Sequence, residues 1–123
     1  MPETDLPVLL PEIIEEHLGA GTLALALRIP ENLAYFSGHF PGTPIVPGVV
    51  QIHWAVHYAR QSLGIRLPFH RMEAVKFKGL VLPGQRLTLA LHWFAPAHKL
   101  EFNFRSENRE HSSGRIYFIG CDV

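Results

Sequence analysis

The sequence predicts an α+β domain in which an antiparallel sheet wraps around one central helix. Two observations carry this prediction. Residues 48–63 (GVVQIHWAVHYARQSL) have helical periodicity and are nearly all apolar, and strand-like segments lie on both sides of them in the chain. With 123 residues, of which 47% are apolar and 18% charged, the chain has the size and composition of one folded domain. We therefore expect a single domain over residues 1–123.

The chain before the central helix predicts a short helix, a strand and a loop. Residues 11–18 (PEIIEEHL) start with a proline, carry acidic residues early and precede Gly19, which predicts the short helix. Residues 22–29 (TLALALRI) have leucine at alternate positions and predict the strand. Proline and glycine recur through residues 30–47, which predicts a long irregular loop.

The central helix has one polar side. In a helix, His53, His57, Arg60 and Gln61 share a sector of about 100°. Nearly all other positions of the segment are apolar, so the helix must be largely enclosed by protein. In so small a chain, a sheet curled around the helix is the natural enclosure.

The second half of the chain predicts an antiparallel meander. Strand patterns occupy residues 71–78, 85–94, 99–105 and 115–119, with turn-like sequences at 83–84, 95–98 and 107–114. We expect four or five strands in total. Because an open edge of such a sheet commonly pairs with a second copy, we expect a homodimer or a higher homo-oligomer.

Charge and cysteine content argue against several functions and locations. Eleven basic residues balance eleven acidic ones, so the chain has no overall field that attracts nucleic acid or an anionic membrane. The longest stretch without Asp, Glu, Lys or Arg, residues 32–59, contains three prolines, which is unsuited to a membrane helix. The single cysteine, Cys121, cannot form an internal disulfide, and the N-terminus lacks the basic region of a secretory signal. We therefore expect a cytoplasmic location, with no nucleic-acid or membrane partner.

Residues 35–49 (YFSGHFPGTPIVPGV) contain the clearest chemical signal. A loop stiffened by prolines holds His39 and leads into a helix N-terminus at Pro47–Gly48. The unpaired amides and partial positive charge of such an end stabilise a carbonyl oxygen that gains negative charge, and a nearby histidine can act as a base. The alternative explanation of this pattern is a structural turn with an exposed histidine.

The run YFSGHFPGTPIVPGVVQ resembles the signature of the 3-hydroxyacyl-acyl-carrier-protein dehydratases of the FabA/FabZ type, which are hot-dog-fold enzymes. Residues 71–87 (RMEAVKFKGLVLPGQRL) are similar to the next strand and turn of that family, so the resemblance covers about residues 22–95. The helix segments VVQ and HWA also resemble the smaller dehydratases of aryl-polyene clusters. The resemblance implies a hot-dog fold and a dehydratase that acts on 3-hydroxyacyl thioesters of acyl carrier protein or coenzyme A. No cofactor is expected, because the elimination involves no net redox change.

The resemblance also implies roles for individual residues. His39 matches the family's catalytic histidine, and Gly48 matches the glycine whose amide polarises the thioester carbonyl. Contacts with the substrate are implied for Phe40, Pro47, Val49 and His57. In the family, each active site combines the loop histidine of one subunit with a helix residue of the other.

That helix residue is a glutamate or aspartate in the family, whereas this sequence has His53. Three explanations remain open. His53 can donate the proton that the departing hydroxyl needs, because imidazoles titrate near neutral pH. Alternatively, the chain is a hot-dog acyl thioesterase or a non-catalytic acyl-thioester-binding protein. In the third explanation, His53 is a core-facing histidine with a hydrogen-bond partner.

Two further groups of residues invite a functional interpretation. His53 and His57 have the spacing of two zinc ligands, but Trp54 stands where the zinc-protease motif has glutamate, so we expect no metal. Basic residues that could contact an acidic carrier protein are Arg60, Arg66, Arg71, Lys76, Lys78 and Arg86.

Overall fold

The computed structural model describes residues 6–36, 42 and 44–120. These residues form six strands, one α-helix and two short 3-10 helices. The strands are β1 (Glu12–Gly19), β2 (Thr22–Arg28), β3 (Phe69–Phe77), β4 (Arg86–Phe94), β5 (Lys99–Ser106) and β6 (Arg109–Phe118). The helices are η1 (Ala34–Phe36), α1 (Gly48–Ser62) and η2 (Ala95–Ala97). Within the described ranges, no helix is long and apolar enough to cross a membrane.

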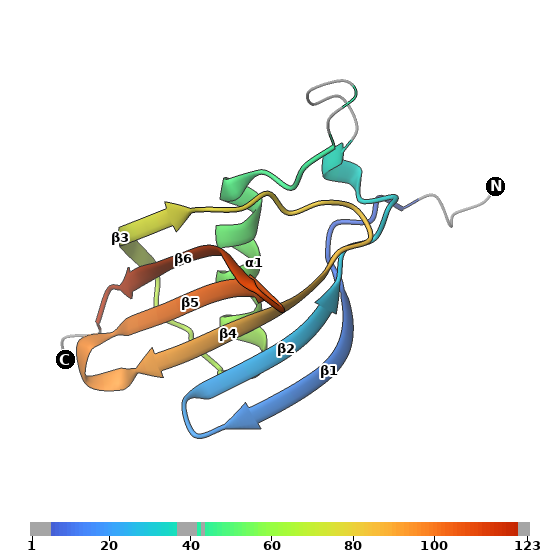
Figure 1. The fold of residues 1–123 in the computed structure, drawn as a ribbon. Coiled ribbons are helices and arrows are strands. Elements are labelled where there is room, and N and C mark those ends of the chain that lie inside the picture. Colours follow the sequence, from blue (N-terminus) through green and yellow to red (C-terminus); the bar gives the residue numbers. More distant parts are fainter. Residues whose placement is uncertain (1–5, 37–41, 43, 121–123) are drawn as a thin grey trace.

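The strands form one antiparallel sheet in the order β1-β2-β4-β5-β6-β3, and α1 lies against one of its faces (Figure 1). The register brings alternate apolar residues of neighbouring strands together: Leu25 pairs with Leu89, which in turn pairs with Phe104. The helix covers the face on which these residues lie. The predicted α+β class is confirmed, and the arrangement is the hot-dog fold that the resemblance implies.

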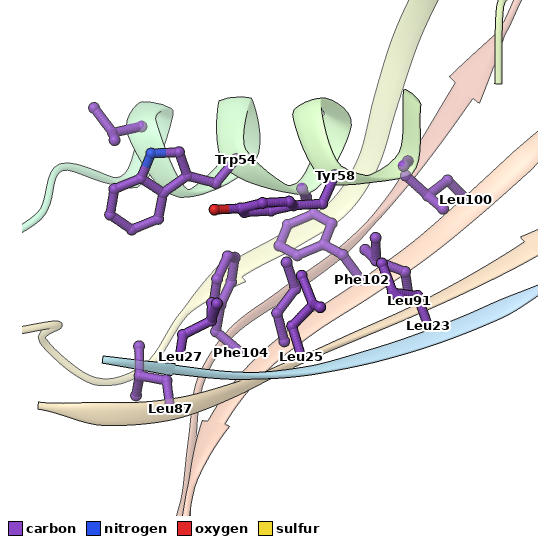
Figure 2. Packing of buried hydrophobic residues seen from close by; sticks show 14 of the residues in the cluster. Leu23, Leu25, Leu27, Trp54, Tyr58, Leu87, Leu91, Leu100, Phe102 and Phe104 are labelled. Atoms are coloured by element: carbon purple, nitrogen blue, oxygen red, sulfur yellow. The ribbon is translucent and has the colours of Figure 1, made fainter. Parts of the chain in front are cut away.

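The core lies between α1 and the sheet. Trp54 and Tyr58 point from the helix toward the leucines of β2 and the phenylalanines of β5 (Figure 2). Trp54 is fully buried, and its indole Nε1–H also donates to the Leu9 carbonyl oxygen at 3.0 Å. Burial of one long apolar stripe explains why residues 48–62 fold as a helix although glycine opens the segment.

The helix predicted at residues 11–18 is wrong, because this segment forms a strand. Residues 12–19 form β1, an exposed edge strand that pairs with β2 through a tight hairpin in which Gly21 has φ +70°. A helix of eight residues is marginal in water, because nucleation is costly and few hydrogen bonds follow it. Pairing with the edge of β2 provides backbone hydrogen bonds on both sides of a register shift between Ile13 and Glu15 instead, so the sheet decides the conformation of this segment.

The last strand is longer than predicted. Residues 107–114 were expected to form a turn, but β6 already begins at Arg109 and carries buried His111 and Ser112. Gly114 explains part of the difference. A Cβ atom there would lie 2.8 Å from the Phe102 ring, so this glycine allows β6 to pass close to its neighbour, as strand glycines often do.

The expected enclosure of the helix is only half realised. The sheet covers the face of α1 that carries Trp54 and Tyr58, but Val49 on the opposite side is 71% exposed and His53 is exposed as well. The other apolar residues on this side, Ile52 and Val56, are partly buried. Within the described part of the chain, one side of an almost entirely apolar helix therefore lacks a cover.

Candidate active site

The start of α1 provides the electrostatic part of the candidate site. The helix begins at Gly48 after Pro47, whose carbonyl oxygen accepts the amides of Val50 at 3.1 Å and Gln51 at 3.2 Å. Pro47 makes no side-chain cap, so no side chain of this residue competes for the first amides of the helix. The amides of Gly48 and Val49, which precede these two bonds, have no intrahelical partner and carry partial positive charge, which suits a carbonyl oxygen.

Gly48 is fixed by the side chain of Phe77. A Cβ atom at residue 48 would lie 2.6 Å from Cζ of Phe77, closer than real Cβ contacts occur. A side chain at residue 48 would therefore displace this ring from its place beside the first turn of the helix. Phe77 is itself 51% exposed, so it borders the open side of the helix N-terminus. No local pattern identified Phe77, because β3 and α1 meet only in the folded chain.

A buried polar connection ties the first turn of α1 to the sheet. The side chain of Gln51 donates from Nε2 to the Val46 carbonyl oxygen at 3.2 Å, and its Oε1 accepts from the Ser112 hydroxyl at 2.7 Å. Gln51 and Ser112 are 3% and 0% exposed. Their bonds set the position of the helix start relative to β6. A polar residue on the apolar stripe of the helix was the available signal for Gln51.

A second buried histidine holds the segment between β3 and β4. His111 in β6 lies with Nδ1 3.0 Å from the Leu80 carbonyl oxygen and Nε2 2.8 Å from the Ser106 hydroxyl. A carbonyl can only accept, so Nδ1 carries a proton, and in the neutral ring Nε2 then accepts from the Ser106 hydroxyl. The next residue of the segment, Val81, accepts the Val46 amide at 2.8 Å. His111 therefore positions the backbone that supports the approach to α1.

The two histidines of α1 differ in environment. His53 is exposed, and no described residue forms a hydrogen bond with its ring, so the core-facing explanation for His53 is wrong. His57 is half-buried and its ring packs edge-on against Tyr58, with ring centroids 5.0 Å apart. Within the described residues, no group of three or more potential metal-ligating side chains occurs, and the pair His53 and His57 has no third ligand there.

No carboxylate takes the place of the family's helix acid among the nearest acids in the sequence. Glu73 is paired with Arg71 and, at 3.5 Å, with Arg115. Glu31 is exposed and lies beside Gly84, at the start of the turn into β4. His53 is thus the polar side chain that α1 presents on its uncovered side near the N-terminus.

The remaining predicted residues are only partly described. Val49 is exposed next to Gly48, and Pro47 is half-buried. His39 and Phe40 lie outside the described residues, which stop at Phe36 and resume with Gly42 and then Pro44. The structure therefore brings together Pro47, Gly48, Val49 and His53 at one end of α1 and leaves the histidine of the loop as a prediction.

Comparison with known proteins identifies the family. The ApeI-like dehydratase family model, described as ApeI dehydratase, matches residues 15–115. The structure is similar to the dehydratase heterocomplex ApeI:P from Xenorhabdus doucetiae, with a TM-score of 0.83 and 33% identity over 88% of this chain and 96% of that one. The chain belongs to the ApeI-like dehydratase family of hot-dog proteins.

Relatives of this chain in two bacteria are both named as FabZ dehydratases. The 3-hydroxyacyl-[acyl-carrier-protein] dehydratase FabZ of Nitratidesulfovibrio vulgaris is 29% identical over 120 residues, which cover 89% of this chain and 75% of the relative. The FabZ of Ruminiclostridium cellulolyticum is 35% identical over 89 residues, covering 67% of this chain and 62% of the relative. The resemblance to FabZ dehydratases and to the ApeI-like subgroup is thereby confirmed.

Proposed function

We propose that this chain dehydrates 3-hydroxyacyl thioesters to 2-enoyl thioesters, with acyl carrier protein as the carrier. One observation supports this most directly: a member of a dehydratase family exposes a proton-transferring side chain, His53, on the uncovered side of α1 just beyond the helix N-terminus. The relatives named as acting on acyl-carrier-protein substrates support the choice of carrier. A cytoplasmic location belongs to the same proposal and is supported by the single cysteine.

In the proposed reaction, His39 takes the proton from the carbon next to the thioester carbonyl. The Gly48 amide donates a hydrogen bond to the carbonyl oxygen, which gains negative charge in this step. The bond between the third carbon and the hydroxyl then breaks, and His53 gives the departing oxygen a proton. The products are the enoyl thioester and water, so atoms and electrons balance without a cofactor. Pro47, Val49, Phe40 and His57 line the approach of the acyl chain in this proposal.

Incubation with short and medium 3-hydroxyacyl thioesters tests the reaction. We expect absorbance from the conjugated enoyl thioester and no release of free thiol. Free thiol without enoyl product would support a thioesterase. Tight binding of the thioester with neither product would support a non-catalytic acyl-thioester-binding protein.

The proposed assembly is a homodimer that joins two sheets at the β3 edges. This edge has an unpaired side, and it exposes Phe69, Met72 and Phe77 at 44%, 43% and 51%. Val49 and Leu80, 71% and 58% exposed, extend this apolar surface around the helix start. Exposed strand edges with apolar residues favour pairing with another chain. A sedimentation mass of a monomer at micromolar concentration would contradict the homodimer.

Subunit mixing tests whether the two histidines meet across such an interface. His39→Ala and His53→Ala copies should each be inactive alone. After mixing and exchange, a dimer of one copy of each has one site with both histidines intact, so about a quarter of parent activity should return. No recovery, with exchange verified by mass, would mean that both histidines act within one subunit. The Xenorhabdus doucetiae heterocomplex makes a second, different chain the alternative partner if this chain alone is monomeric.

A further inference from the structure

Of the eleven lysines and arginines, five form ion pairs within the chain and a sixth donates to backbone carbonyls. Arg28, Arg71, Lys78, Lys99 and Arg115 each lie within 4.0 Å of a carboxylate. Arg60 donates instead to the carbonyl oxygens of Ile65 and Leu67, at 3.3 and 2.9 Å. Three of the residues predicted to meet an acidic carrier protein, Arg60, Arg71 and Lys78, are therefore already engaged.

Three arginines without an ion pair to a described residue gather in one place. Arg86 begins β4, Arg105 lies near the end of β5, and Arg109 begins β6. Thr88 of β4 pairs with Arg105 of β5, and Arg86 lies two residues before Thr88. Arg86 and Arg105 are therefore diagonal neighbours on the sheet face turned away from α1. All three line an open depression of about 840 Å³. We call Arg86, Arg105 and Arg109 the arginine cluster.

The surroundings of the arginine cluster combine charge with apolar surface. Glu15 and Glu107 line the same depression, and Glu15 faces His17 at 3.4 Å. Glu110 lies nearby but is paired with Lys78 at 3.4 Å. Ile14, 47% exposed, adds an apolar side chain to the lining. Three arginines thus line the same open depression as two glutamates and an isoleucine.

The arginine cluster is connected to the candidate site through the segment between β3 and β4. A Cβ atom at Gly79 would lie 3.1 Å from Nε of Arg109, so the guanidinium packs against this segment. Two residues later, the Val81 carbonyl oxygen accepts the Val46 amide at 2.8 Å, just before Pro47 and the start of α1. In Figure 1 the turn between β5 and β6 lies beside the chain that enters β4. The cluster is therefore at the end of the molecule that holds the helix N-terminus.

We propose that the arginine cluster is the surface on which an acidic carrier protein docks while its acyl thioester reaches the helix N-terminus. This inference rests on the proposed function. A carrier protein presents its substrate on a long flexible arm, so its docking surface can lie at a distance from the reacting atoms. Several strands contribute to the surface, and it mixes cations with Ile14, which fits an acidic protein face better than a single nucleotide. Because the net charge of the chain is zero, local unpaired arginines rather than an overall field would steer such a partner.

The test compares one 3-hydroxyacyl group on three carriers: the carrier protein, coenzyme A and pantetheine. The variant carries Arg86→Gln, Arg105→Gln and Arg109→Gln together. We expect kcat/KM for the carrier-protein substrate to fall roughly tenfold or more, because each exposed charge contributes modestly. For pantetheine and coenzyme A substrates, kcat/KM should stay within about twofold of the parent. The loss should shrink as salt rises, since screening already weakens the parent interaction.

The matched control changes two cations that do not line the depression of the arginine cluster, Lys99→Gln and Arg115→Gln, and should leave all three substrates within about twofold. Replacing the cluster with lysines should retain most activity on the carrier-protein substrate, and thermal melting verifies that each variant is folded. An equal loss on all three carriers, a loss confined to coenzyme A, or no loss would overturn the inference.

Failure of the proposed function is a separate outcome. If the parent dehydrates none of the three substrates, binding of fluorescent carrier protein still tests the docking surface. We then expect salt-dependent anisotropy that the triple variant loses and the control variant keeps. Equal binding of the carrier protein by the parent, the triple variant and the control variant would count against docking at the arginine cluster. No binding by the parent would count against it as well.

Discussion

The two sides of α1 have similar residues and different surroundings. On one side, Trp54 and Tyr58 are buried against the sheet, whereas on the other Val49 and His53 are exposed. Apolar burial stabilises a fold roughly in proportion to the area removed from water, so the first side contributes most of the helix's share of stability. The second side leaves the helix N-terminus and a proton-transferring residue accessible. Substitutions on the two sides should therefore change different properties.

The largest expected effect is on the exposed side. His53→Ala should lower dehydratase turnover by on the order of 10² to 10⁴, because no carboxylate replaces the lost proton donor. His53→Glu restores the family's residue and should preserve or raise activity.

Gln61→Ala, an exposed change on the same helix, is the control and should leave turnover and stability unchanged. Urea unfolding should give His53→Ala the same stability as the parent within about 0.5 kcal/mol. Full activity in His53→Ala would remove this residue from the mechanism.

The next largest effect is on the buried side. Trp54→Ala should lower the free energy of unfolding by about 3–5 kcal/mol, through a cavity beneath α1 and the lost bond to the Leu9 carbonyl. Chemical denaturation at fixed protein concentration measures this loss of unfolding free energy, and Gln61→Ala again serves as the reference. A loss below about 1 kcal/mol would show that the packing in Figure 2 is not what holds the helix.

A smaller effect on stability is expected from the buried hydrogen bonds of Gln51, which position the start of α1. Gln51→Leu breaks the bonds to Val46 and Ser112 and should cost about 1–3 kcal/mol of unfolding free energy. A double-mutant cycle with Ser112→Ala should give a coupling of about 0.5–3 kcal/mol. Because Gln51 positions the first turn, kcat should fall more than KM rises in Gln51→Leu. Additive losses would mean that the two side chains do not act together.

The smallest effect concerns the hydroxyl of Tyr58. Its Oη is buried and has no hydrogen-bond partner among the described residues, so Tyr58→Phe should stabilise the protein by about 1 kcal/mol near neutral pH. Burial raises the pKa of Tyr58 to about 12 from 10.0. The unfolded chain therefore loses the proton of Tyr58 at lower pH than the folded chain does. The free energy of unfolding of the parent is unaffected by this ionisation below pH 10 and falls as pH rises toward 12.

Unfolding experiments between pH 9 and 12 should thus show a steeper loss in the parent than in Tyr58→Phe, with the difference on the order of 1–3 kcal/mol. Identical pH slopes for the two proteins would mean that the hydroxyl is solvated or paired in the folded state.

The sequence alone determined the elements whose pattern is local. Residues 48–62 form the predicted helix, and β2, β4 and β5 match their predicted strands within one or two residues. In each, apolar residues repeat with the period of the element, so a short window carries the information. The signature around Pro47–Gly48 likewise identified the family and one end of the candidate site before any contact was known.

The tertiary structure decided whatever depends on neighbours distant in the chain. Residues 12–19 became β1 because β2 offers them a pairing edge, and β6 extends through the expected turn because His111, Ser112 and Gly114 find partners across the fold. The close approach of Phe77 to Gly48 and the gathering of the arginine cluster join separate strands. Local periodicity cannot encode such contacts, because their free energy arises only when the sheet brings the partners together.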